Sequence, residues 1–136
     1  MSTSHGIDIF TWEGEGYRPF LVSHRDWLVA LMNWEPRFDA AQAGRVERHN
    51  QTDEVFVLTR GHGLLVVDSD QVIQVVDMQP RVIYNVTRGT WHSVIGTRDS
   101  SWLIVEASDM GAIKTDYRQL TEDELAQLRG QYPGWI

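Results

Sequence analysis

The chain has 136 residues, of which 42% are hydrophobic and 23% are charged, a balance typical of a soluble globular protein. This length suits one domain. The formal net charge is −7, and Lys and Arg are scattered, so we expect no nucleic-acid partner. No apolar run in the sequence approaches the ~20 residues that a membrane helix needs, so we expect no membrane partner either.

Cysteine is absent from the sequence. Disulfides, thiolate metal ligands and a cysteine nucleophile are therefore excluded, and any metal ion must be bound by nitrogen and oxygen. Residues 1–6 lack the basic and apolar regions of a secretory signal. A cytoplasmic location is the simplest expectation.

From residue 17 onward, short apolar runs alternate with turn residues, a pattern typical of an all-β fold. The segment 35–42 is polar and contains Pro36, which favours a loop. The apolar runs predict strands at 17–23, 27–34, 45–49, 54–59, 64–68, 72–77, 82–86, 91–95 and 102–107. Strands this close together are expected in sandwiches and barrels, and no segment between them has the period of a helix.

One helix is predicted, close to the end of the sequence. Thr121 and Glu124 have the spacing of a capping box, with Thr121 as the N-cap, and Gly130 follows the last helical residue. The predicted organisation is a single domain over 1–136, with an N-terminal arm at 1–16, barrel strands at 17–107 and a C-terminal segment at 108–136 that holds a short helix at 122–129.

Polar side chains interrupt the inner face of two neighbouring predicted strands. Glu47 and His49 are two residues apart on one strand, so they point to the same face. Glu54 begins the next strand and shares a face with Phe56 and Leu58. An acidic side chain on an inner face requires a partner, which a metal ion or a cationic group would supply.

A second polar stretch lies at residues 86–94, where a tight turn leads into a strand. His92 shares a face with Val94 and is expected to line the interior. Two histidines and a carboxylate that converge inside a barrel form a facial ligand set, which leaves other coordination positions open to water and substrate. The candidate metal ligands are therefore His49, Glu54 and His92.

These residues resemble the two motifs of the cupin superfamily. The first motif has a His-x-His pair, a glutamate and, after six more residues, a glycine, which His49, Glu54 and Gly61 match in spacing. In the second motif a histidine follows Pro-x-Gly after two residues, as His92 follows Gly89. More narrowly, the chain resembles small single-domain bacterial cupins without an assigned reaction. The resemblance implies a cupin-type double-stranded β-helix, or jelly-roll barrel, with a short C-terminal helix.

The resemblance covers about residues 45–107, with some departures from the motifs. Glu47 stands where the first histidine would be, so a fourth ligand would be a carboxylate or nothing. Thr87, Arg81 and Gly96 replace a usual proline, glycine and asparagine at positions that are not ligands. A second carboxylate hardens the site and favours a divalent ion such as iron(II), manganese, nickel or zinc over copper.

The alternative for this constellation is a barrel that keeps the motif without an ion, with Glu54 bonded to a histidinium or an arginine. Glu47 has three interpretations: a ligand, a general base, or an ion-pair partner of Arg45 or Arg48. Asp53 is expected to point away from the interior and to make a turn contact.

Six tryptophans are present, and we expect them mainly to fill the core and cover an interface. The alternative is that one or two of them join Tyr84 and Phe56 around a mouth that holds an apolar or ring-shaped ligand. Arg45, Arg81 and Arg88 are candidates for binding the carboxylate of a substrate.

Three classes of function are consistent with these residues. The first is a metal-dependent enzyme for a small organic acid or sugar derivative, with Glu47 as its general base and isomerisation, lyase chemistry or oxygenation left open. The second is a module that binds or senses a small ligand without turnover. The third is a structural barrel with an aromatic-filled cavity and no metal. Under all three, the resemblance implies a homodimer. The apolar strands at 17–34 are a second reason to expect one, because they would otherwise present an exposed edge.

Overall fold

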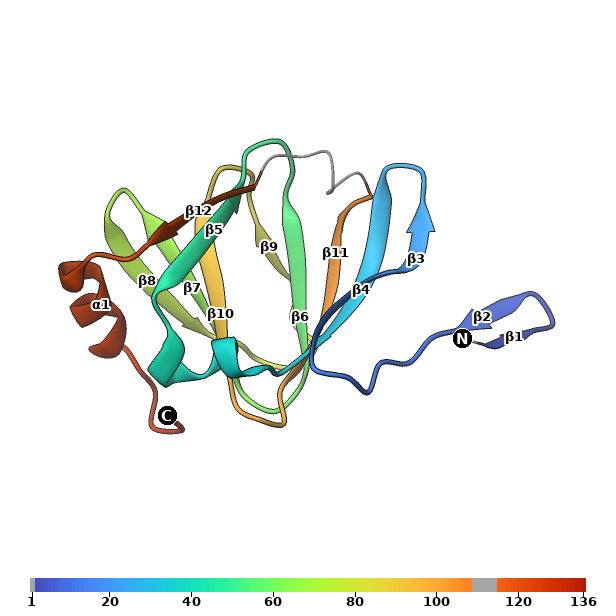
Figure 1. Cartoon of the computed structure of the whole chain (residues 1–136), viewed down its shortest axis with the longest axis horizontal. Helices are drawn as coiled ribbons and strands as arrows, with labels where there is room; N and C mark the ends of the chain where they lie inside the picture. Colours follow the sequence, from blue (N-terminus) through green and yellow to red (C-terminus); the bar gives the residue numbers. More distant parts are fainter. Residues whose placement is uncertain (1, 109–114) are drawn as a thin grey trace.

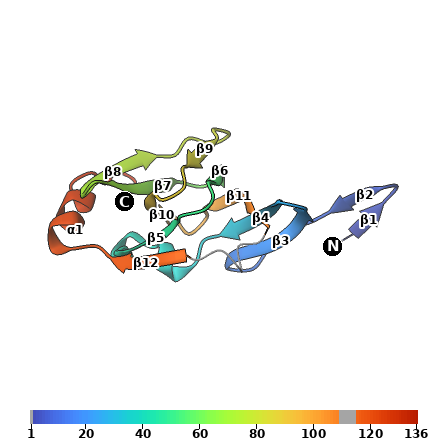
Figure 2. The same cartoon turned by 90° about the horizontal axis from the view of Figure 1, so that it is seen from above.

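The computed structural model describes residues 2–108 and 115–136. These residues form two five-stranded antiparallel sheets that face each other, a small N-terminal hairpin and one α-helix (Figures 1 and 2). The predicted all-β jelly-roll architecture with a short C-terminal helix is confirmed.

The first sheet has the strand order β12-β5-β10-β7-β8 and the second the order β3-β4-β11-β6-β9. In chain order, the first sheet contains β5 (Arg45–His49), β7 (Gly63–Ser69), β8 (Val72–Asp77), β10 (Trp91–Gly96) and β12 (Thr115–Gln119). The second contains β3 (Gly16–His24), β4 (Trp27–Asn33), β6 (Glu54–Arg60), β9 (Tyr84–Val86) and β11 (Ser101–Ala107). Successive strands from β5 to β11 mostly alternate between the sheets, so residues close in sequence face each other across the interior.

The main core lies between the two sheets and follows from side-chain alternation. On β4, β6 and β11, every second side chain is buried in this core, namely those of Leu28, Ala30, Met32, Phe56, Leu58, Trp102 and Ile104. The first sheet contributes Leu65 and Val94 from the facing side. This layer is where a polar inward-facing residue must find a partner.

The first sheet is buried on both faces, which explains the uninterrupted apolar run of β7. Leu64 and Val66 point away from the main core into a second cluster, together with Ile95 of β10. Helix α1 (Glu122–Arg129) covers this outer face and buries Leu128 there. The helix has the predicted bounds, and the capping box between Thr121 and Glu124 forms as predicted.

Three short strands were not predicted. β1 (Ser2–Ser4) and β2 (Ile7–Ile9) form the N-terminal hairpin, within the segment expected to be an arm. β12 is polar, so it has no apolar alternation, and it forms because it pairs with β5. The predicted loop at 35–42 contains two short 3₁₀ helices, η1 (Pro36–Phe38) and η2 (Ala40–Gln42).

The strand predicted at 82–86 is shorter in the structure, because only Tyr84–Val86 pair with β6. Arg81 precedes it with a φ of 66°, in the left-handed region that favours glycine. Arg81 stands where the cupin motif often has that glycine, so the departure occurs at a backbone position that is unfavourable for a residue with a Cβ atom.

Gly61 occupies the turn between β6 and β7 for a steric reason. Its φ is 69°, and a Cβ atom there would lie 2.8 Å from the backbone of Ser100. Every residue other than glycine would therefore push apart the turns that end β6 and begin β11. The motif glycine is explained by this close approach.

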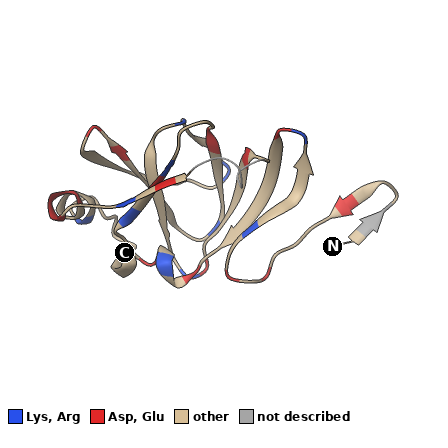
Figure 3. Cartoon of the chain, turned by 45° about the horizontal axis from the view of Figure 1, so that its top comes forward, with Lys and Arg blue, Asp and Glu red and all other residues tan. Residues whose placement is uncertain are grey.

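Acidic and basic residues are interspersed over the described part of the chain (Figure 3). Within the residues that the structure describes, no helix has both the length and the apolar character required to cross a bilayer.

Candidate metal centre and its cavity

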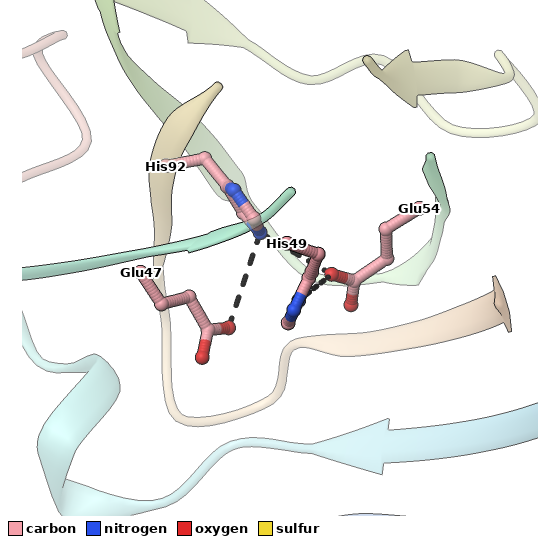
Figure 4. Close-up of side chains that lie close together, drawn as sticks. All are labelled: Glu47, His49, Glu54 and His92. Carbon is pink, nitrogen blue, oxygen red and sulfur yellow. Dashed lines mark hydrogen bonds and ion pairs between the residues drawn. The ribbon is translucent and has the colours of Figure 1, made fainter. Parts of the chain in front are cut away.

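Four polar side chains meet between the sheets, where the sequence places them on inner faces. Glu47 and His49 come from β5, His92 from β10 and Glu54 from β6 (Figure 4). His92 is the register partner of Glu47 across the β5–β10 ladder, and Glu54 reaches them from the other sheet. The group therefore connects the two sheets, and the structure brings together all four residues that the sequence singled out.

Glu54 is the centre of this group. One of its oxygens, Oε2, lies 2.8 Å from Nε2 of His49 and 3.2 Å from Nε2 of His92. Glu47 is more peripheral, with its Oε1 3.9 Å from Nε2 of His92. His49, Glu54 and His92 are buried, whereas Glu47 is partly exposed.

The orientation of His92 is fixed from behind by the backbone. Its Nδ1 lies 3.0 Å from the carbonyl oxygen of Thr90, which can only accept a hydrogen bond. Nδ1 therefore carries the hydrogen, and Nε2 is the nitrogen that is directed at Glu54. In a neutral imidazole this leaves the Nε2 lone pair free for a metal ion.

His49 is held by a residue that the sequence analysis missed. Its Nδ1 lies 3.0 Å from the hydroxyl oxygen of Thr115 on β12, the register partner of His49. When Nδ1 carries the hydrogen, the Thr115 hydroxyl accepts its hydrogen bond, and the Nε2 lone pair is then directed inward, as a metal ligand requires. The sequence carried no signal for Thr115, because β12 lacks the alternation by which strands are recognised.

The protonation states follow from these contacts. Burial alone would raise the pKa of Glu54, but the hydrogen bonds from His49 and His92 outweigh it and lower this pKa below its usual range. For His92, burial acts to lower the pKa, but the hydrogen bond to Glu54 outweighs it and raises this pKa. Without metal, both shifts therefore favour the charged forms, the Glu54 carboxylate and the His92 imidazolium.

The four donor atoms fit a divalent metal ion. Each residue offers one ligand atom, and these atoms all lie within 4.8 Å of one another. Ligands that share an ion at roughly 2.1 Å can be at most about 4.2 Å apart, so only a small contraction is required. Two imidazoles and one or two carboxylates are a nitrogen and oxygen donor set suited to iron(II), manganese, nickel or zinc.

Glu47 has no arginine partner among the described residues. Arg48 pairs with Asp116, with 3.0 Å between Nε and Oδ2, and Arg45 lies over the Tyr117 ring at 4.7 Å. Of the three interpretations made from the sequence, the ion pair with an arginine is therefore wrong in this structure. Glu47 instead lies beside His92, a position that is compatible with the two other interpretations, a metal ligand or a general base.

The group opens onto a cavity of about 580 Å³ between the sheets. Its wall is largely apolar, with Leu28, Met32, Phe56 and Ile104 contributed by the second sheet. This volume accommodates a small organic molecule beside the four polar residues. The aromatic plug expected for a purely structural barrel is therefore absent from the described residues.

Other sequence expectations have mixed outcomes. Asp53 makes the expected turn contacts, accepting hydrogen bonds from Asn85 and from the backbone of Arg88. Of the three arginines considered for carboxylate binding, only Arg45 lines the cavity. Phe56 lines it as well, but no tryptophan of the described chain does, and Trp102 is fully buried in the core as expected.

A larger hollow, of about 1170 Å³, lies outside the sheets between β7, β10 and α1. Four of the charged side chains that line it, those of Arg48, Asp68, Arg118 and Glu124, form ion pairs. Arg118 contacts Asp68 and Glu124, the latter at 2.8 Å, and Arg48 binds Asp116. The guanidinium groups of Arg48 and Arg118 also lie over the ring of Trp91.

A third carboxyl group, that of Glu106 on β11, also lines the inner cavity. Its side chain is only 7% exposed, and burial raises the pKa of Glu106 to about 7. The sequence analysis did not identify it. The signal was its alternation with Trp102 and Ile104, which predicts an inward direction, but the end of a strand often reaches solvent.

Solved structures with the same fold are similar to this chain, with low sequence identity. A cupin-2 domain protein from Shewanella frigidimarina is 21% identical, with a TM-score of 0.53, over 69% of this chain and 83% of that one. Pac13, a nucleoside dehydratase, is 12% identical, with a TM-score of 0.53, over 76% of this chain and 75% of its own. A Streptomyces Pac13 variant with uridine has a TM-score of 0.54 at 12% identity, over 81% and 82%.

No protein-family model matches the sequence, and no curated protein does. The likeness to solved structures is therefore a likeness of fold. Together with the two motifs, it shows that the chain has a cupin fold, as the sequence resemblance implied.

The raised pKa of Glu106 predicts a pH-dependent stability in the metal-free protein. The pKa of Glu106 is about 7 in the folded chain, against 4.5 for an ordinary glutamate. The folded state therefore keeps this proton up to a higher pH than the unfolded state does. The stability contributed by the protonated group is complete below pH 4.5 and is lost as the pH rises through 7. The full loss is roughly 3 kcal/mol, of which about 2 kcal/mol falls between pH 5.5 and 8.5.

The measurement is urea unfolding of the wild type and of Glu106→Gln at these two pH values, with chelator present. The glutamine side chain does not titrate, so the variant should gain stability relative to the wild type by about 2 kcal/mol at the higher pH. A stability difference that does not change with pH would contradict the assigned pKa.

Proposed function

We propose that this protein is a metal-binding cupin that acts as a metal-dependent enzyme on a small organic acid or sugar derivative. The observation that supports this proposal is the convergence of Glu47, His49, Glu54 and His92 on one point at the wall of an internal cavity. His49, Glu54 and His92 are the proposed ligands, and the ion is divalent iron, manganese, nickel or zinc. The lack of cysteine in the sequence is consistent with a cytoplasmic location.

A bound divalent ion would supply Lewis acidity to a substrate oxygen. The chain itself supplies the positioning, because Thr90 and Thr115 orient the two imidazoles from behind. Glu47 is the proposed general base. Its partly exposed carboxylate faces the cavity, and among the described residues its ion-pair partner is His92, with 3.9 Å between Oε1 and Nε2.

The alternative is a cupin that binds or senses a small ligand without turnover. The largely apolar wall of the cavity and its volume of about 580 Å³ favour ligand binding under either function. One similar structure, the Streptomyces Pac13 variant, contains uridine, so a nucleoside is a reasonable first compound to test. Recovery of a bound compound chemically unchanged after incubation with metal-loaded protein would favour the alternative.

Metal content is the first prediction of the proposed function. The protein, stripped with chelator and incubated with each of the four ions, should retain about one ion per chain by elemental analysis. The double variant His49→Ala/His92→Ala removes two nitrogen ligands and should lose nearly all of it. Glu54→Gln, which keeps the shape of the side chain and removes its charge, should bind at least tenfold more weakly.

The matched control is His24→Ala/His62→Ala, which removes two exposed histidines outside the group. Its metal content should equal that of the wild type, and circular dichroism should show all variants folded. A wild type that retains none of the four ions would contradict the proposed enzyme and leave the ligand-binding alternative.

Thr115 gives a second prediction. Thr115→Val has nearly the same shape but cannot accept the hydrogen bond from Nδ1 of His49. We expect roughly a 10- to 100-fold loss of metal affinity, measured by competition with a chromogenic chelator, while the unfolding midpoint changes little. Unchanged affinity would mean that His49 is not a ligand, or that the hydroxyl does not orient it.

We also propose that the protein is a homodimer, formed through its N-terminal elements. β3 is an edge strand of the second sheet, and β4 is covered by β3 and β11. Phe20 and Val22 on β3 are 54% and 40% exposed, and the β1–β2 hairpin projects beyond this edge with Ile7 and Ile9 at 63% and 51% exposure (Figures 1 and 2). A hairpin of two three-residue strands is not stable by itself, so a second copy is the proposed support.

Phe20→Asp tests this surface. Phe20 has a φ of 59°, which aspartate adopts more readily than phenylalanine, so the variant should fold while a charge disrupts the proposed interface. Multi-angle light scattering should give a dimer for the wild type and a monomer for the variant. The control Ile83→Asp changes an exposed residue outside this surface and should stay dimeric. A monomeric wild type would refute the proposal.

A further inference from the structure

Glu106 occupies a specific place on the cavity wall. On β11 its register partner on one side is Leu28 of β4. On the other side, Val105 pairs with Val55 of β6, so the next residue along each strand brings Glu106 level with Glu54. Glu106 is therefore an inward-facing carboxyl group in the same row as a proposed metal ligand, but outside the four-residue group.

The carboxyl group of Glu106 has no partner in the part of the chain that the structure describes. No hydrogen bond or ion pair reaches it from the described residues, although the residue as a whole is only 7% exposed and lines the cavity. An acid that lies among apolar side chains without a hydrogen-bond partner is unfavourable for folding compared with an apolar residue of similar size. An apolar side chain would pack better beside Leu28 and Ile104, so stability does not account for a glutamate here.

The groups that face Glu106 restrict what it can bind. Glu54 lies on the neighbouring strand and Glu47 on the opposite sheet. These two acidic groups would repel a ligand that placed its own carboxylate beside Glu106. Burial raises the pKa of Glu106 to about 7, which makes the neutral acid available near neutral pH. A hydroxyl group suits both forms, because it accepts a hydrogen bond from the acid and donates one to the carboxylate.

The rest of the cavity suggests the other parts of the ligand. Arg45 lines the rim, where its exposed guanidinium lies over the Tyr117 ring and has no acidic partner within the described ranges. An exposed arginine that lacks an acidic partner can bind the carboxylate of a ligand through its guanidinium group. Between Arg45 and Glu106, the wall formed by Phe56 and Ile104 is suited to an apolar or ring-shaped body.

We propose that Glu106 is a ligand-binding residue that selects for a hydroxyl group, and that the ligand class is a small hydroxy acid with an apolar body. The hydroxyl hydrogen-bonds with Glu106, and the carboxylate points toward Arg45. This inference rests on the proposed function and narrows its substrate class from organic acids or sugar derivatives to hydroxy acids.

The experiment uses two probes that differ by one hydroxyl group, 4-hydroxyphenylacetate and phenylacetate, titrated by calorimetry into zinc-loaded protein. Three proteins are compared: wild type, Glu106→Leu and Glu106→Gln. Leucine removes the hydrogen bond and fills the space, and glutamine can still donate and accept. Both probes carry the same carboxylate, so the change in the 4-hydroxyphenylacetate-to-phenylacetate affinity ratio reports on the contact between the hydroxyl group and residue 106.

We expect the affinity ratio to fall about tenfold in Glu106→Leu and to stay within about threefold of the wild type in Glu106→Gln. Phenylacetate affinity should be similar in all three, which a general loss of structure would not produce. An affinity ratio unchanged in Glu106→Leu would overturn the proposal, as would the failure of both probes to bind the wild type at 10 mM.

Zinc content measured on the same samples separates this inference from the proposed function. If zinc is bound and neither probe binds, the proposed metal centre is supported and the proposed hydroxy-acid ligand class is refuted. Absence of zinc refutes the metal centre, and the affinity ratios are then measured on the metal-free proteins, because Glu106 lies outside the metal-binding group.

Discussion

The contact between Glu54 and two imidazoles, which joins the two sheets, is the interaction on which the site depends. Glu54 is buried in an apolar layer, and its charge is tolerated there because His49 and His92 face it at hydrogen-bond distance. The same nitrogen and oxygen atoms that form this pair are the ones a metal ion would use. Metal binding therefore competes with the proton on the histidine, so we expect the affinity for metal to fall as the pH is lowered.

Acidic groups accumulate in the cavity beyond what this pair requires. Glu47 and Glu106 add two carboxyl groups to the same interior, and neither has a basic partner other than the histidines among the described residues. A divalent cation offsets this excess of negative charge, whereas an apolar ligand alone would not. The cavity thus has a polar end suited to an ion and an apolar wall suited to an organic body, an arrangement that fits chemistry at a metal better than storage of a purely apolar compound.

The departures from the cupin motifs have physical consequences that differ in kind. Glu47 replaces a histidine within the metal-binding group, so it changes the donor set and the charge of the site. Arg81 replaces a glycine at a left-handed backbone position outside the site, and the strand that follows begins later than expected. The first departure bears on reactivity and the second on local backbone strain.

The sequence by itself determined the all-β class, the capped helix and the inward direction of His49, Glu54 and His92, because alternation and capping depend on residues only a few positions apart. Only the tertiary structure decided which partners complete the site. Thr115 reaches His49 because β12 pairs with β5 through backbone hydrogen bonds, across 66 positions in the sequence, and backbone pairing leaves no trace in a polar strand. For Glu106, alternation along β11 indicated an inward direction, but only the packing of β11 between β4 and β6 shows that the end of this strand is buried.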